Sequence, residues 1–245
     1  MTGKAYIGTS GWIYKHWKDS WYKDVRPKDW LKYMTERFTA LEANGTFYHL
    51  PKKETFEAWR EATPKDFRFA IKAHRYLTHR KKLKEISEGI ERQKKACEGL
   101  GEKLAAVVWQ LPANFKANLE RLEHFLTELK EWSETRHAIE FRNKTWFTKE
   151  TVEMLEQSGV AVCISDAPKW PIWEIVTTDF VYVRLHGHTH LYASKYSDEQ
   201  LEIWARKVKK WMRGGCDVHV YFDNDWRANA PYNAERLLNF VYGER

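Results

Sequence analysis

The fold is decided by an alternation in the stretch Phe180-Val-Tyr-Val-Arg-Leu-His186. Its alternate residues Val181, Val183 and Leu185 are all aliphatic, whereas the residues between them end in the ionisable side chains Arg184 and His186. In a closed α/β barrel, alternate side chains of each strand face the interior, and the outward series is apolar because helices pack on it. The stretch therefore predicts a barrel strand that carries polar groups inward at its carboxyl end.

Similar stretches, rich in β-branched and aromatic residues, recur along the chain and alternate with amphipathic ones. We expect strands at Ala5–Ser10, Thr39–Asn44, Phe67–Ala73, Ala105–Leu111, His137–Arg142, Val160–Ser165, Phe180–His186 and Val218–Asp223. We expect helices at Trp30–Phe38, Glu54–Glu61, Leu83–Leu100, Leu119–Trp132, Lys149–Gln157, Asp198–Met212 and Asn233–Val241. The sequence thus predicts an α/β fold, a single (β/α)8 TIM barrel over residues 1–245.

The sixth strand is followed by a segment that does not fit this repeat. Ala167–Asp179 contains Pro168 and Pro171, which leave little room for a regular helix. We therefore expect one irregular or missing helix after the sixth strand. Elsewhere, Ser197 stands three residues before Gln200, which is typical of a capping box at a helix start.

Composition narrows the class of protein. The net charge of +7 and the pI near 9.1 favour anionic partners. A charged fraction of 31% with few glutamines is typical of proteins from hot environments.

The cysteines Cys97, Cys163 and Cys216 lack the paired spacing of a zinc or dithiol site. We find no signal-like or membrane-spanning apolar run, so we expect a cytoplasmic protein that does not act at a membrane.

The same alternation places a polar layer inside the barrel, at the carboxyl ends of several strands. The inward residues there are expected to be Glu42, Asn44, Lys72, Gln110, Glu140, Arg142, Arg184, His186, Tyr221 and Asp223. Unpaired buried charge is costly, and the carboxyl ends of barrel strands are where barrel enzymes carry their sites. We therefore expect a ligand site there. The alternative is a structural plug in which the three acids neutralise Lys72, Arg142 and Arg184.

Eight motifs in order along the chain strengthen the barrel interpretation. They are Ile7-Gly-Thr-Ser-Gly-Trp-Ile-Tyr14, Leu41-Glu-Ala-Asn-Gly-Thr-Phe-Tyr48, Thr63-Pro-Lys-Asp-Phe-Arg-Phe69, Thr78-His79, Trp109-Gln-Leu-Pro112, Glu140-Phe-Arg142, Tyr182-Val-Arg-Leu-His-Gly187 and Tyr221-Phe-Asp-Asn-Asp225. On these residues the chain resembles the YecE-like family (DUF72), TIM-barrel proteins without an assigned activity. The resemblance also implies a distant kinship with endonuclease IV and sugar isomerases. Those proteins bind divalent metals in the mouth of the barrel, the opening at the carboxyl ends of its strands.

We interpret the polar layer as an enzyme-like site. Glu42 and Glu140 are the acid/base candidates, with Lys72 and His186 as further catalytic candidates. Lys72, Arg142 and Arg184 suit a small anionic, phosphate-bearing ligand, and hydrolase or lyase chemistry is expected. The candidate ligand-binding residues are Ser10, Trp12, Tyr14, Asn44, Tyr48, His79, Gln110, Arg142, Asp166, Arg184, Tyr221, Asp223 and Asn224.

Two other functions stay open. No cofactor is predicted, but Glu140, Asp166 and His186 are alternative ligands for a divalent metal, which would fit a nuclease resembling endonuclease IV. The basic run Arg75–Lys84, with Tyr76 able to stack on a base, and the positive net charge fit a non-catalytic nucleic-acid-binding protein. The sequence does not indicate the oligomeric state.

Overall fold

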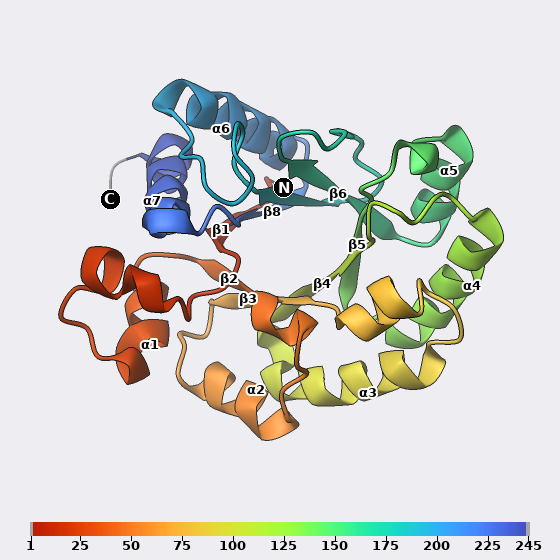
Figure 1. Cartoon of the computed structure of the whole chain (residues 1–245), viewed down its shortest axis with the longest axis horizontal. Coiled ribbons are helices and arrows are strands. Elements are labelled where there is room, and N and C mark those ends of the chain that lie inside the picture. The colour runs from red at the N-terminus through yellow and green to blue at the C-terminus, as the bar shows by residue number, and fades with distance from the viewer. Residues whose placement is uncertain (1, 244–245) are drawn as a thin grey trace.

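A computed structural model describes residues 2–243, and it contains an eight-stranded parallel sheet that curls into a barrel (Figure 1). The strands follow the order β1-β8-β7-β6-β5-β4-β3-β2. Their bounds are β1 Ala5–Thr9, β2 Ala40–Ala43, β3 Arg68–Lys72, β4 Leu104–Gln110, β5 Arg136–Glu140, β6 Val160–Asp166, β7 Phe180–Leu185 and β8 Asp217–Phe222. Each lies within two residues of the expected strand, so the barrel prediction is confirmed.

The helices lie outside the strands in Figure 1. Their bounds are α1 Trp30–Thr35, α2 Lys53–Glu61, α3 Ser87–Cys97, α4 Leu119–Leu129, α5 Lys149–Gln157, α6 Asp198–Arg213 and α7 Asn229–Tyr242. Residues 167–179, between β6 and β7, contain no helix, as expected from the two prolines. The capping box of Ser197 and Gln200 is present. Within residues 2–243, no helix has both the length and the apolar character needed to cross a membrane.

Two helix starts differ from the expectation. α3 begins at Ser87 rather than at residue 83, because Lys82, Leu83 and Glu85 all have positive φ, which a right-handed helix does not allow. α7 begins four residues earlier than expected, at Asn229. It includes Pro231 in its first turn, where a proline removes no helical hydrogen bond.

The barrel closes between β1 and β2. Ser10 and Glu42 form a parallel bridge there, and the Gly11 N–H donates to the Glu42 carbonyl oxygen at 2.7 Å. The two strands approach so closely at Gly8 that a Cβ there would lie 1.8 Å from the Ala40 carbonyl oxygen. Glycine is therefore required for the closure.

The interior has an apolar lower part and a polar upper part. Small side chains and aromatic rings fill the lower part, including Ala40, Ala70, Ala106, Ala138, Ala161, Phe180, Tyr182 and Tyr221. The outward residues Val181, Val183 and Leu185 belong instead to the core between the sheet and the helices. The predicted alternation of β7 is therefore correct, and it brings Arg184 and His186 to the upper, carboxyl end of the barrel.

Candidate functional site

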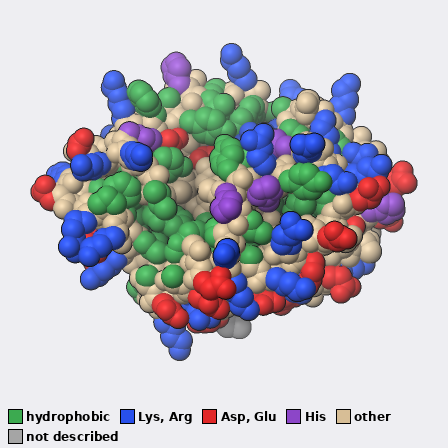
Figure 2. All heavy atoms as spheres, turned by 60° about the horizontal axis from the view of Figure 1, so that its bottom comes forward, with side chains coloured by type: hydrophobic (Ala, Val, Ile, Leu, Met, Phe, Trp, Pro, Cys, Tyr) green, Lys and Arg blue, Asp and Glu red, His purple; other side chains and the backbone are tan. Residues whose placement is uncertain are grey.

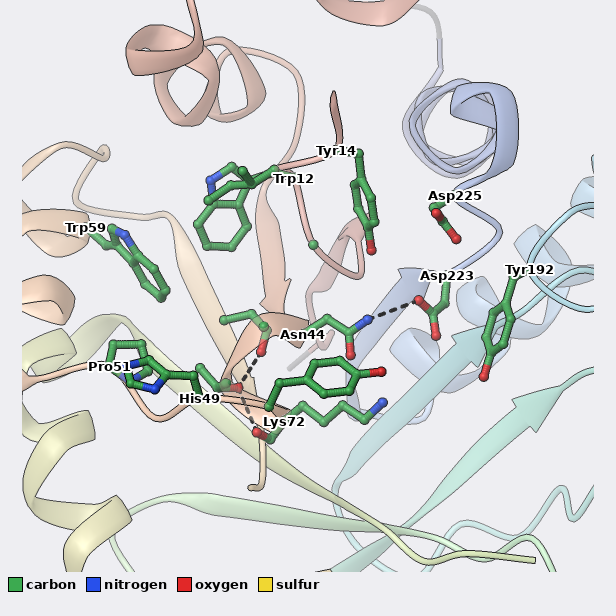
Figure 3. Close-up of a pocket in the computed structure, with 16 residues that line it drawn as sticks. Trp12, Tyr14, Asn44, His49, Pro51, Trp59, Lys72, Tyr192, Asp223 and Asp225 are labelled. Atoms are coloured by element: carbon green, nitrogen blue, oxygen red, sulfur yellow. Dashed lines mark hydrogen bonds between the residues drawn. The ribbon is translucent and has the colours of Figure 1, made fainter. Parts of the chain in front are cut away.

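A cavity of about 570 Å³ opens at the carboxyl ends of the strands (Figure 3). Aromatic rings and polar groups share its walls. It is lined by Gly11, Trp12, Ile13, Tyr14, Ala43, Asn44, Gly45, Thr46, Tyr48, His49, Pro51, Trp59, Lys72, Tyr192, Asp223 and Asp225. Of the residues predicted from the sequence, Trp12, Tyr14, Asn44, Tyr48, Lys72 and Asp223 border this space.

The turn after β1 builds one wall of the cavity. Gly11 has φ +86°, a left-handed conformation that favours glycine, and a Cβ there would lie 2.7 Å from the Tyr14 hydroxyl. The turn lets the Tyr14 hydroxyl donate to the Ser10 carbonyl oxygen at 2.7 Å. Trp12 packs edge-on against Trp59, with ring centroids 5.0 Å apart. These contacts hold aromatic surfaces toward the cavity.

Arg184 lies beside the cavity, fully buried, and its guanidinium is surrounded by carboxylates. Its Nη1 donates to Glu140 at 2.6 Å, and its Nη2 donates to Asp223 at 3.0 Å and to the Ser10 hydroxyl at 3.1 Å. Nε and Nη2 also donate to Glu42 at 3.1 and 2.8 Å. Burial opposes its charge, but the three carboxylates raise the pKa of Arg184 well above its usual value. Arg184 is thus neutralised by the protein, as the plug alternative describes.

The two predicted acid/base residues are engaged in the same network. Glu42 accepts from Tyr182 at 2.7 Å and from Ser10, in addition to Arg184. Glu140 accepts from Arg142 Nε at 2.6 Å. Burial alone would raise the pKa of Glu140, but Arg142 and Arg184 hold it well below the usual range. Both glutamates are fully buried and neither borders the cavity.

Lys72 is the predicted cation that does border the cavity. Its side chain is buried, and Nζ lies 4.3 Å from the centroid of the Phe47 ring. Within residues 2–243, Nζ has no hydrogen-bond acceptor and no carboxylate at ion-pair distance. Burial, followed by the charge of Arg184, lowers the pKa of Lys72 to about 8. Figure 3 shows its side chain extending toward the part of the cavity that Asp223 and Tyr192 border.

Other basic groups gather beside Lys72. Arg142 stacks on the Trp170 ring at 3.6 Å, and its Nη2 is buried without a hydrogen-bond partner among the described residues. His79 lies 3.3 Å from Gln110, and burial and then the charges of Lys72, Arg142 and Arg75 lower its pKa to about 4. The pKa of His79 thus reports positive charge on this side of the mouth, although Glu140 pairs with Arg142 there.

The opposite side of the cavity carries two aspartates. Burial alone would raise the pKa of Asp223, but Arg184 and His186 lower it to about 2. Burial and the charge of Asp223 raise the pKa of Asp225 to about 6. Asn44 donates to Asp223 at 3.5 Å, and His186 Nδ1 lies 2.9 Å from its other oxygen. At neutral pH the cavity thus offers an ionised carboxylate beside one that binds a proton readily.

The remaining predicted residues lie in the supporting structure. Asp166 accepts from the Tyr196 hydroxyl at 3.0 Å, and Asn224 donates to Ser194 and Asn233. The hydroxyl of Tyr221 lies 2.9 Å from His219 in the barrel interior. Among residues 2–243, no three His, Cys, Asp or Glu side chains are grouped as a metal site would require. Glu140, Asp166 and His186 therefore do not fit a shared metal ion in this arrangement.

The alternation of the strands did not identify several residues of the mouth. Asp225, Trp59 and Tyr192 border the cavity, and Trp170 covers Arg142. Most of them come from connections after strands, where no periodic pattern indicates which way a side chain points. Only Asp225 had a signal, because it ends the motif that begins at Tyr221.

Comparisons with known proteins give one consistent result. The sequence model of a family described as "Protein of unknown function DUF72" matches residues 6–244. The chain is 24% identical to the UPF0759 protein YunF of Bacillus subtilis, over 96% of this chain and 94% of that protein. It is 26% identical to the UPF0759 protein YecE of Escherichia coli, over 84% and 81%. The crystal structure of a DUF72 family protein from Thermotoga maritima has a TM-score of 0.87 and 30% identity, and covers 97% of this chain and 99% of that one.

Proposed function

The chain belongs to the DUF72 family of proteins of unknown function, and we propose that it is an enzyme that binds a small anionic, phosphate-bearing ligand in the cavity at the mouth of its barrel. The observation that carries the proposal is Lys72, whose side chain is buried except where it borders the cavity. Removing a charge from water is costly unless an opposite charge accompanies it. Within residues 2–243 no carboxylate lies at ion-pair distance from Lys72 Nζ, and Asp223, Glu140 and Glu42 act on it only from farther away, so that an anionic ligand in the cavity would supply a close partner.

Neighbouring groups support an anion at this place. The guanidinium of Arg142 lies behind the cavity wall under Trp170, paired with Glu140, and its Nη2 lacks a hydrogen-bond partner in the described part of the chain. Its charge favours an anion there, and a shift of Trp170 would let Nη2 bind one. Arg75 adds a further positive charge close to His79. Arg184, in contrast, acts indirectly, because it orients Glu42, Glu140 and Asp223 and adds positive potential beside Lys72.

The acidic side of the cavity supports proton transfer. Catalytic pairs often consist of two groups whose environments separate their pKa values, and the pKa of Asp223 is about 2 while that of Asp225 is about 6. We assign the acid/base role to these two residues rather than to Glu42 and Glu140, because the aspartates border the cavity. The rings of Trp12 and Tyr48 offer flat surfaces for the organic part of the ligand.

Sulfate binding tests the anion site. Calorimetry on the full chain should detect sulfate binding, and Lys72→Met should weaken it at least about tenfold, because it removes the charge with little change in side-chain length. The matched control is Lys95→Met, which alters a lysine that is 68% exposed and pairs with Glu91 on α3. Equal affinity in the wild type and Lys72→Met would contradict the proposal.

A second candidate is nucleic-acid binding. Tyr48 is 66% exposed and Tyr76 is 48% exposed, and Arg75 lies 5.8 Å from the Tyr48 ring. Figure 2 shows a face with apolar and His side chains near its middle and Lys and Arg side chains around them, together with several Asp and Glu side chains. A single strand would stack its bases on such rings and place its phosphates near such cations. Binding of a short single-stranded oligonucleotide should then fall steeply with salt, and binding that does not respond to salt would eliminate this candidate.

A further inference from the structure

We propose that Lys72 is a nucleophile that forms an imine with the carbonyl carbon of a ligand that is an aldehyde or ketone and also carries a phosphate or carboxylate group. The inference rests on the proposed anion-binding enzyme and names the substrate class of the same cavity. It also assigns a covalent step to a named atom, the Nζ of Lys72.

Lys72 differs from Lys103, which is also buried, in the contacts that its ammonium group makes. Lys72 and Lys103 are the buried lysines within residues 2–243. Lys103 Nζ donates to the Thr63 carbonyl oxygen at 2.6 Å, to the Thr63 hydroxyl at 3.1 Å and to the Arg60 carbonyl oxygen. All three of its protons are used, as expected for a structural lysine. Lys72 Nζ makes none of these contacts and borders the cavity instead.

The surroundings of Lys72 favour its nucleophilic form. An amine attacks a carbonyl carbon only when it is unprotonated, and burial near another cation is how proteins activate lysines for this reaction. Arg184 supplies the cation, and its bonds to three carboxylates fix it in place. The pKa of about 8 leaves a useful fraction of neutral amine at neutral pH. The Phe47 ring at 4.3 Å provides an apolar side to the group.

The step balances with groups that the cavity holds. The neutral amine adds to the carbonyl carbon, and one N–H proton moves to the carbonyl oxygen, which gives a carbinolamine. The nitrogen lone pair then forms the C=N bond while the hydroxyl leaves as water with a proton from Asp225. The products are an iminium cation on Lys72, one water molecule and the Asp225 carboxylate. The pKa of Asp225, about 6, lets it give and regain this proton near neutral pH.

The product also fits the charge of the site. An iminium keeps the positive charge at Lys72, where Asp223 and Glu140 act on it. It also withdraws electrons from the neighbouring carbon, so that a proton or a carbon–carbon bond there breaks more easily. Such chemistry belongs to lyases, and the inference therefore favours the lyase alternative over hydrolysis. Arg142, which Trp170 covers and which does not border the cavity, would act on the anionic end of the ligand through its charge.

Borohydride trapping tests the imine directly. The full chain is incubated with dihydroxyacetone phosphate, and separately with pyruvate, then reduced and analysed by intact and peptide mass spectrometry. We expect one adduct, on Lys72, at least tenfold above any other lysine. It should be absent in Lys72→Arg and formed more slowly in Asp225→Asn. Dihydroxyacetone, which lacks the anionic group, should give much less adduct, and added sulfate should protect Lys72.

The variant Lys72→Arg separates the two proposals. It keeps a positive charge, so sulfate should still bind to it, but it lacks the primary amine. If neither probe modifies Lys72 in a wild-type protein that binds sulfate, the imine is wrong and the anion site stands. If an adduct on Lys72 is trapped but sulfate neither binds nor protects Lys72 from modification, imine formation is supported and the proposed anion site is wrong. Circular dichroism of each variant shows that the barrel remains folded.

Discussion

Arg184 and Glu42 face each other inside the barrel, with Nε 3.1 Å from Oε2 and Nη2 2.8 Å from Oε1, and both side chains are fully buried. The pair joins β7 to β2 across the interior. Two further carboxylates share the same guanidinium. The pair therefore belongs to the supporting structure of the mouth. Its loss should lower the free energy of unfolding before it affects ligand binding.

Replacement of Arg184 should destabilise the fold strongly. Arg184→Met leaves Glu42, Glu140 and Asp223 close together without their shared cation, and breaking a buried pair in this way costs about 3–5 kcal/mol. Arg184→Lys should recover little of this, because one ammonium cannot reproduce the planar contacts with three carboxylates. Urea denaturation gives the free energy of unfolding. A stable Arg184→Met variant that has lost only sulfate binding would mean that Arg184 contacts the ligand.

Sulfate affinity should fall in two steps as the pH rises. Asp225 loses its proton near pH 6 and adds a negative charge to the cavity, and Lys72 loses a positive charge near pH 8. Each change weakens the attraction for an anion. Sulfate is the suitable probe because its own charge is constant over this range. Calorimetry from pH 5 to 9 should show the lower step vanish in Asp225→Asn and the upper step vanish in Lys72→Met, whereas a profile shared by all three proteins would count against these assignments.

His137 should make the fold sensitive to acid. Its Nδ1 accepts from Trp109 Nε1 at 3.1 Å and its Nε2 donates to the Trp132 carbonyl oxygen at 3.0 Å, an arrangement that requires the neutral ring. Burial lowers its pKa to about 4, whereas an unfolded histidine has a pKa of about 6.5. Between these values only the unfolded chain binds the proton, so stability is full above pH 6.5 and falls toward pH 4.

The expected slope for His137 is about 1.4 kcal/mol per pH unit within that window. Urea denaturation at several pH values measures it. In His137→Gln the fall in stability from pH 6.5 to 4.5 should be smaller by that slope, although the variant is less stable overall. His219, whose pKa burial lowers to about 3, should retain its own contribution in this variant. The same slope in both proteins would show that His137 is not the group responsible.

Closure of the barrel should depend on Gly8. In Gly8→Ala the new methyl group would lie 1.8 Å from the Ala40 carbonyl oxygen, so β1 and β2 must separate, at a cost of about 3 kcal/mol or more. Gly45→Ala is the matched control, because no atom lies within 4 Å of its added Cβ and its φ is not positive. It should change stability by less than about 1 kcal/mol. Thermal unfolding of the two variants compares them, and similar melting temperatures would refute the role of Gly8.

Strand periodicity predicted the barrel and most of the polar layer, because successive side chains of a strand point alternately inward and outward. This alternation does not predict which of the inward charged side chains form ion pairs with one another. Arg184 and Lys72 are both inward cations, yet Arg184 binds three carboxylates, whereas Lys72 has the Phe47 ring beside it and no carboxylate of the described residues at ion-pair distance. That difference depends on side-chain reach across the barrel and on the stagger of the strands, which a single sequence does not reveal.

Connections between elements were less predictable for a different reason. Asp225 and Tyr192 reach the cavity from segments without periodicity, and Trp170 covers Arg142 from a segment without a helix. Their positions are set by turns and by contacts distant in sequence. The late start of α3 has the same origin, since the backbone at Lys82, Leu83 and Glu85 takes a conformation that its residue types do not favour.

The shared guanidinium of Arg184 also bears on how such a barrel can change over generations. Replacing any one of Glu42, Glu140 or Asp223 alters the environment of the other two, so that the effects of single replacements do not add. A lineage can therefore alter the rim of the mouth one residue at a time, while these four positions should be inherited or lost as a set.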